Sequence, residues 1–130
     1  MNQEAADLWQ RAVQALATAQ SLSSSDPDAA ASRAYYAAFY AVSARFILSG
    51  TIFTRHSAVE AAVHRDLVKA GLSAADIGKG YSFLHSLRST ADYGGRMHVS
   101  LEEAAEAVAA AGLIVSEMRR LASSAGTQLP

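Results

Sequence analysis

Four residues whose side chains can take part in catalysis or ligand binding lie along one stretch of the chain at helical spacing. They are Tyr81, His85, Arg88 and Asp92, separated by three or four residues. At about 100° per residue this spacing places them along one side of a helix. An arginine beside such a polar groove can hold a phosphate or the carboxylate of a partner. The alternative is a simple i, i+4 ion pair between Arg88 and Asp92 on the helix surface.

The chain has four histidines, His56, His64, His85 and His98, and no cysteine. The absence of cysteine excludes disulfides, thiolate metal sites and cysteine nucleophiles. No HExxH motif or carboxylate-rich spacing accompanies the histidines, so the sequence predicts no metal site and no cofactor. His56 precedes a predicted helix, where it either helps to cap that helix or enters the groove. His64 is expected on the surface.

The composition is typical of one helical domain. The chain has 130 residues, of which 51% are hydrophobic and 18% charged, and this excludes a disordered chain. Its net charge of −1 gives no overall attraction to nucleic acid or to an anionic membrane. No apolar run reaches the roughly 18 residues of a membrane span, and the N-terminal residues lack a signal-peptide pattern. We therefore expect a cytoplasmic protein without a membrane partner.

The helix expected at the centre of the fold runs from Pro27 to Gly50. Its aromatic residues fall on one arc about 160° wide, and most of its remaining surface is alanine. A helix that is apolar on nearly every side needs neighbours on nearly every side. Arg33 lies at the edge of the aromatic arc and requires a carboxylate partner if it is buried. We expect Asp92 to be that partner, with Tyr36 nearby.

The other predicted helices surround this one, over about Gln3–Leu22, Ser57–Ala70, Tyr81–Ala91 and Ser100–Ala122. The residues Ser73–Asp76 look like an earlier start of the helix at Tyr81, but Gly78 and Gly80 each weaken that start by about 1 kcal/mol relative to alanine. We therefore expect a kink or a false start there. The predicted fold is all-α, a four-helix up-down bundle with a short extra helix between the second and third long helices. One domain occupies residues 1–122, and residues 123–130 form a frayed tail.

Three blocks of the sequence together resemble the small bacterial HEPN-domain proteins. They are Ser32–Phe39 (SRAYYAAF), Arg55–Ser57 (RHS) and Leu87–Tyr93 (LRSTADY). The resemblance covers about residues 26–121 and keeps the order and spacing of all three blocks. It implies a helical bundle that pairs into a homodimer. It also implies partnership with a minimal nucleotidyltransferase in a toxin–antitoxin or related defence system.

Active members of that family are metal-independent RNases in which four to six residues separate an arginine from a following histidine. By this resemblance Arg88 matches the arginine, which steadies the scissile phosphate while the histidine handles protons. The matching histidine would fall at residues 93–95, which are Tyr, Gly and Gly. His98 is the nearest candidate beyond them. In some family systems the partner nucleotidyltransferase modifies a tyrosine near Tyr93, although Tyr93 can equally close the helix end against the core.

Three interpretations follow from these observations. The leading one is a dimeric HEPN-like module that pairs with a nucleotidyltransferase and binds nucleotide or RNA. The second is a divergent RNase toxin that uses Arg88 with His98 or His85, and the third is a helical adaptor without a ligand. The candidate catalytic residues are Arg88 and His98. The candidate groove residues are Arg33, Tyr36, His56, Tyr81, His85, Asp92 and Tyr93.

Overall fold

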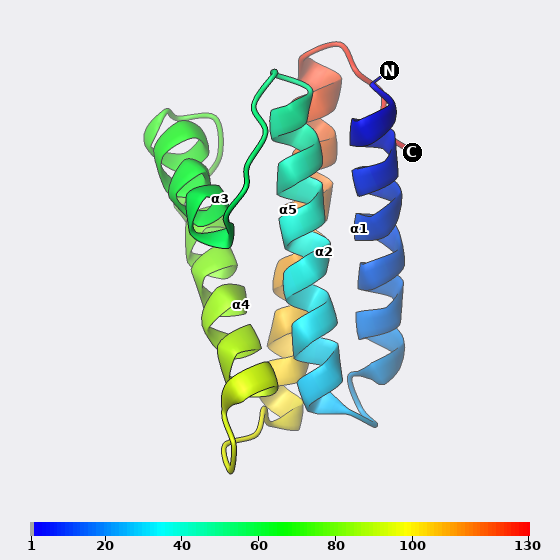
Figure 1. Cartoon of the computed structure of the whole chain (residues 1–130), viewed down its shortest axis with the longest axis vertical. Coiled ribbons are helices and arrows are strands. Elements are labelled where there is room, and N and C mark those ends of the chain that lie inside the picture. The colour runs from blue at the N-terminus through cyan, green and yellow to red at the C-terminus, as the bar shows by residue number, and fades with distance from the viewer. Residues whose placement is uncertain (1) are drawn as a thin grey trace.

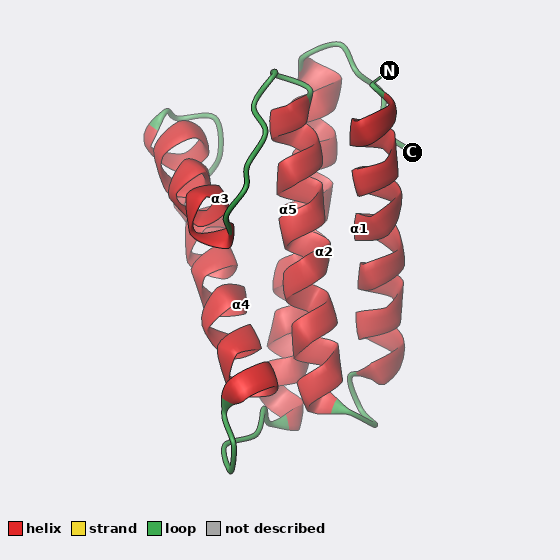
Figure 2. Ribbon diagram, viewed as in Figure 1, coloured by secondary structure: helices red, strands yellow, loops and turns green. Residues whose placement is uncertain are grey.

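The computed structural model describes residues 2–130, and it contains only helices and the turns between them. The elements are α1 (Gln3–Leu22), α2 (Pro27–Ile47), α3 (His56–Ala62), the π-helix η1 (Val63–Lys69), α4 (Ala75–Tyr93) and α5 (Leu101–Ser124). No strand occurs in residues 2–130, which confirms the all-α prediction (Figure 2). The long helices α1, α2, α4 and α5 run lengthwise, and α3 with η1 lies beside α4 (Figure 1).

Helix α2 lies at the centre of the fold, as its composition predicts. Its first turn is stabilised by Asp26, which accepts a hydrogen bond from Ala29 N at 3.2 Å, and by Pro27, which needs no hydrogen-bond acceptor there. The helix packs against α1, α3, α4 and α5. Seven of its alanines are completely buried and let these neighbours approach closely; they are Ala30, Ala31, Ala34, Ala37, Ala38, Ala41 and Ala44.

The helix ends follow local signals closely. Helix α1 has its predicted bounds, whereas α2 ends at Ile47 and leads into a turn in which Gly50 adopts a φ of 85°. Only glycine adopts that conformation readily. At the start of α5, Ser100 Oγ accepts from Glu103 N at 3.0 Å and Glu103 Oε1 accepts from Ser100 N at 3.0 Å. These two bonds form the predicted capping box.

Helix α4 begins at Ala75, within the start indicated by Ser73–Asp76, and continues through both glycines, so the alternative of a false start does not occur. A Cβ added at Gly78 would lie 2.8 Å from His64 Nδ1 and 2.9 Å from its Cε1. Gly78 therefore makes room for the His64 imidazole from η1. A Cβ at Gly80 would meet nothing closer than 3.7 Å, so no such packing reason applies there.

The segment after α5 lies against α1. Leu129 is buried, and the Pro130 carbonyl oxygen accepts hydrogen bonds from Trp9 Nε1 at 3.2 Å and from Arg119 Nε at 3.1 Å. The Arg119 guanidinium also lies over the Trp9 ring, 5.3 Å from its centre.

Among the described helices, none combines the length and the apolar character needed to cross a membrane.

Candidate functional site: the α2–α4 seam

Most of the predicted groove residues gather where α2, α3 and α4 meet. Helix α2 contributes neighbouring aromatic rings, α3 begins at a histidine, and α4 presents polar side chains on successive turns. This region is called the α2–α4 seam below, and it comprises Ser32, Arg33, Tyr35, Tyr36, Phe39, His56, Glu60, Ser82, His85, Arg88, Asp92 and Tyr93.

Arg88 lies in the middle of the seam, and its side chain is 17% exposed. Its Nη2 donates to Tyr36 Oη at 2.9 Å and, at the limit of hydrogen bonding, to Tyr93 Oη at 3.5 Å. Its Nε lies 3.0 Å from Asp92 Oδ2, so the predicted i, i+4 ion pair forms. The Nε–H is nevertheless not aligned for a hydrogen bond with any acceptor in residues 2–130. The guanidinium is thus held in place, with its buried Nε beside the Asp92 carboxylate.

Tyrosine rings enclose the Arg88 guanidinium. Its central carbon lies 5.6 Å from the ring centre of Tyr35, 5.5 Å from that of Tyr36 and 5.3 Å from that of Tyr93. Each distance is within the range of a cation–π interaction. Burial by itself lowers the pKa of Arg88, but the Tyr36 and Tyr93 hydroxyls and Asp92 raise the pKa overall. Tyr93 is 73% exposed, so one of the three rings faces solvent.

Arg33 does not form the expected link with Asp92. Its guanidinium lies over the Tyr36 ring, 4.9 Å from the centre, and no carboxylate in the described part of the chain is within ion-pair distance of it. Asp92 instead pairs with Arg88 and accepts a long hydrogen bond from Ser32 Oγ at 3.4 Å. Two guanidinium groups therefore lie near Tyr36, and only one of them is paired with a carboxylate.

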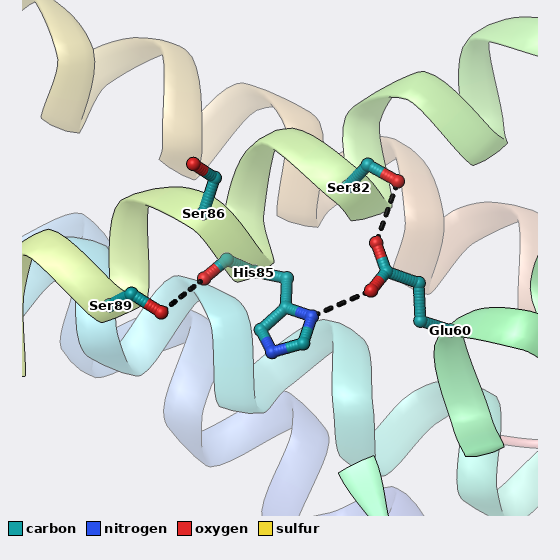
Figure 3. Close-up of a pocket in the computed structure, with 5 residues that line it drawn as sticks. All are labelled: Glu60, Ser82, His85, Ser86 and Ser89. Carbon is teal, nitrogen blue, oxygen red and sulfur yellow. Dashed lines mark hydrogen bonds and ion pairs between the residues drawn. The ribbon is translucent and has the colours of Figure 1, made fainter. Parts of the chain in front are cut away.

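A hydrogen-bonded chain joins η1, α4 and α3 next to Arg88. His64 Nε2 lies 2.8 Å from Ser82 Oγ, and Ser82 Oγ donates to Glu60 Oε2 at 2.7 Å. His85 Nδ1 lies 2.8 Å from Glu60 Oε1 (Figure 3). Because Ser82 gives its only proton to Glu60, His64 Nε2 is the donor to Ser82. Because an ionised carboxylate only accepts, His85 Nδ1 carries a proton, and Nε2 is the acceptor whenever the imidazole carries a single proton.

Glu60 remains ionised in this arrangement. Burial alone raises its pKa, but the hydrogen bonds from Ser82 and His85 outweigh that effect, and the pKa falls below its ordinary value. The His85 ring stacks on Tyr35 with 5.3 Å between ring centres, and its side chain is 27% exposed. A shallow pocket of about 240 Å³ opens beside the pair (Figure 3). Its lining residues are Glu60, Ser82, His85, Ser86 and Ser89.

His56 packs against the aromatic rings of α2 and does not cap α3. It is the first residue of α3, and no side-chain hydrogen bond caps that helix. Its Nδ1 lies 2.7 Å from Tyr35 Oη, and its ring stacks on Phe39 with 4.3 Å between ring centres. Burial lowers the pKa of His56, and the neighbouring Arg88 and His85 lower it further. The imidazole is therefore kept neutral in the seam.

Two of the predicted site residues are not on the seam surface: Tyr81 packs beneath it against Tyr35, with 6.0 Å between ring centres, and His98 lies at the start of α2. Tyr81 is fully buried; burial and the adjacent Tyr35 raise its pKa, and its hydroxyl makes no hydrogen bond within residues 2–130. The His98 side chain is 70% exposed, and its Nδ1 lies 2.7 Å from Asp28 Oδ2. Asp28 precedes Tyr36 by two turns of α2, about 12 Å along the helix axis. The structure therefore pairs His98 with the start of α2 and does not bring it to Arg88.

Among the seam residues not predicted from the sequence are Tyr35, Glu60 and Ser82. Glu60 follows His56 by four residues, and Ser82 precedes His85 by three, so both lie on helix faces that the histidines already mark. That spacing was the available signal. Within residues 2–130, no group of three or more histidine, aspartate or glutamate side chains is placed to hold a metal ion.

A model of the HEPN domain matches residues 5–121, a range that reaches from α1 into the last turn of α5. The chain belongs to the HEPN family. A UPF0332 protein of Thermotoga maritima is similar to this HEPN domain, with 45% identity over 65 residues. The match covers 50% of this chain and 49% of the relative, so this chain spans about half the length of the relative.

All three blocks that carried the HEPN resemblance meet in the seam. The first lies on α2, the second precedes and begins α3, and the third forms the last turns of α4. Residues far apart in sequence thus become one surface of this HEPN domain. The three blocks contribute these seam residues: Ser32, Arg33, Tyr35, Tyr36, Phe39, His56, Arg88, Asp92 and Tyr93.

Proposed function

We propose that this HEPN domain is a four-helix up-down bundle that acts as the dimeric partner of a minimal nucleotidyltransferase in a toxin–antitoxin or defence system. In this proposal it binds nucleotide or RNA at the α2–α4 seam. One observation carries the binding proposal. The Arg88 guanidinium is held among three tyrosine rings, and one of them, Tyr93, is exposed. The HEPN match supports the helical module, and the nucleotidyltransferase partner is what the resemblance of the three blocks implies.

The arrangement suits a ligand that has both a phosphate and a base. Arginine binds phosphate through several donors at once, and Arg88 keeps a buried Nε–H without an aligned acceptor. Arg33 adds a second guanidinium without an ion-pair partner among the described residues. Tyr93 offers an exposed aromatic face, and bases stack on such faces with about 1–3 kcal/mol each. Asp92 is the competitor that a bound phosphate must displace.

Binding is favoured over cleavage because the usual arginine–histidine spacing is absent. Residues 93–95 contain no histidine, and His98 pairs with Asp28. A metal-independent endoribonuclease is the second candidate, and one observation favours it. His85 stands one helical turn before Arg88, oriented by Glu60, and this is the carboxylate–imidazole geometry of a general base.

The binding proposal is tested by fluorescence anisotropy with a fluorescein-labelled single-stranded RNA of 12 nucleotides. The wild-type chain should bind it with an affinity that falls as salt rises. Arg88→Gln should weaken binding about tenfold or more, the range expected for a hydrogen bond to a charged group. Arg65→Gln is the matched control, because Arg65 pairs with Asp66 on η1 outside the seam. Equal loss in both variants would contradict a site at Arg88, and RNA cleavage that Arg88→Gln abolishes would favour the second candidate.

The partner proposal needs its own measurements. Sedimentation equilibrium should give the mass of a dimer at micromolar concentration. A minimal nucleotidyltransferase encoded beside the gene should co-purify with the wild-type chain when the two are co-expressed. A monomer that binds neither a nucleotidyltransferase nor RNA would refute the proposed function and favour the ligand-free adaptor.

A further inference from the structure

A separate hollow opens between α1 and α2, which pack side by side along their length (Figure 1). Its volume is about 330 Å³, and it shares only Arg33 with the seam. All but one of its lining side chains are polar, and none of them is acidic. This hollow is called the α1–α2 pocket below, and its lining residues are Arg11, Gln14, Ala15, Thr18, Arg33 and Tyr40.

The polar side chains of the α1–α2 pocket come from one face of each helix. On α1, Arg11, Gln14 and Thr18 follow one another at spacings of three and four residues. On α2, Arg33 and Tyr40 are seven residues apart, which is two helical turns. A short turn makes the two helices antiparallel, so these faces meet along the groove (Figure 1). Hydrogen-bond donors from both helices therefore line the same hollow.

The two guanidinium groups of the pocket are not neutralised. No carboxylate in residues 2–130 lies within ion-pair distance of Arg11 or Arg33. The acidic residue nearest to Arg11 in sequence is Asp7, which accepts a hydrogen bond from Gln3 Nε2 at 2.9 Å and lines an adjoining hollow. The Arg33 guanidinium is already positioned over the Tyr36 ring, 4.9 Å from its centre. Two positive charges at one hollow attract an anion to it.

We propose that the α1–α2 pocket binds a small anion that carries at least two negative charges on phosphate or carboxylate groups. Guanidinium groups bind the oxygens of both kinds of group through paired donors. Thr18 and Tyr40 add hydroxyl donors, and Gln14 adds an amide. The volume lies at the lower end of the range for small-molecule sites, about 300–1,000 Å³. This site goes beyond the proposed function, because it does not include Arg88.

The test uses pyrophosphate and succinate, each titrated separately into the ¹⁵N-labelled full chain. The side-chain Nε–H resonances of the arginines report on the site directly. Those of Arg11 and Arg33 should move along one binding curve with the same Kd, and that of Arg65 should stay in place, because Arg65 pairs with Asp66 on η1. The probe with the lower Kd identifies the ligand as a phosphate or a carboxylate compound.

Three variants separate a built site from general attraction of anions. Arg11→Gln removes one guanidinium at an exposed position of α1 and should weaken binding about tenfold or more, the range for a hydrogen bond to a charged group. Tyr40→Phe keeps the ring and removes one neutral donor, so binding should weaken about threefold. Arg65→Gln is the matched control, and it should bind as wild type does.

The outcomes distinguish this site from the seam. Arg88→Gln should leave the affinity for both small anions unchanged. If Arg88→Gln weakens binding as much as Arg11→Gln does, the anion lies at the seam, and the α1–α2 pocket is refuted while the proposed function stands. The pocket is also refuted if neither probe moves the Arg11 and Arg33 resonances together, or if Arg65→Gln weakens binding equally. Failure of the chain to bind RNA would refute the proposed function and leave this site intact.

Discussion

The contact between Gly78 and His64 predicts an unusual response to alanine at position 78. An interior helical glycine replaced by alanine normally gains about 1 kcal/mol of unfolding free energy. At Gly78 the new Cβ would lie 2.8 Å from His64 Nδ1, so the imidazole must move and give up its bond to Ser82. That bond is worth about 0.5–1.5 kcal/mol. Gain and loss should cancel, and Gly78→Ala should change the unfolding free energy by less than about 0.5 kcal/mol.

Two other glycines serve as controls on the same scale. A Cβ at Gly80 would meet only ordinary contacts from 3.7 Å outward, and a Cβ at Gly112 would meet nothing within 4 Å. Gly80→Ala and Gly112→Ala should therefore each gain the full value of about 1 kcal/mol. In a His64→Ala background the imidazole is gone and the Val68 Cγ2, 3.2 Å from the new Cβ, must still shift by a few tenths of an ångström, so Gly78→Ala should recover most of that gain. The difference between the two backgrounds is the coupling energy of the pair.

Urea unfolding followed by circular dichroism at 222 nm measures these changes, provided the slope with denaturant is the same in all variants. The reasoning is refuted if Gly78→Ala stabilises the wild-type background as much as Gly80→Ala does. In that case His64 would not occupy the space against α4. The hydrogen-bonded chain through Ser82 and Glu60 to His85 would then lack its first link.

Two further predictions concern the seam. Burial lowers the pKa of His56, so as pH falls the unfolded state binds a proton at this residue before the folded state does. The unfolding free energy should therefore decrease below about pH 6.5. In urea titrations between pH 5 and 7.5, His56→Phe should show a smaller decrease. An unchanged pH dependence in the variant would contradict the lowered pKa. Asp92→Asn removes the carboxylate that competes for Arg88, so affinity for the RNA probe should rise about threefold in the anisotropy assay, within the range of a surface ion pair. Weaker binding by this variant would mean that Asp92 does not compete with the ligand.

The helices were predictable where local pattern and packing agree. Helix α2 carries alanine and aromatic residues on all sides, between an Asp-Pro start and a glycine turn, so both its ends and its enclosure follow from the sequence. Gly78 could not be explained from local pattern. Glycine is unfavourable inside a helix, and it is accommodated here because the His64 imidazole of η1 packs against this position, a contact that the local sequence does not indicate. The predicted false start followed from propensity alone.

The site was predictable in its members but less so in its pairings. Asp92 had two candidate partners, and the local i, i+4 geometry with Arg88 prevailed over the longer contact with Arg33. Tyr81 shares a helix face with His85 but lies closer to the packed interior, a difference of depth that spacing alone does not resolve. Glu60 was missed because its role depends on how α3 docks against α4.

The seven enclosed alanines of α2 limit how this domain can diverge. Any larger side chain at these positions would overfill a packed interior, at about 1–3 kcal/mol each. We therefore expect amino-acid substitutions to accumulate on the solvent-facing sides of α1 and α5, while the sequence of α2 changes slowly. If the sequence of α2 changes slowly among related chains, lack of space alone would explain it. Evidence of selection for a ligand has to come from α3 and α4, where side chains have room to vary.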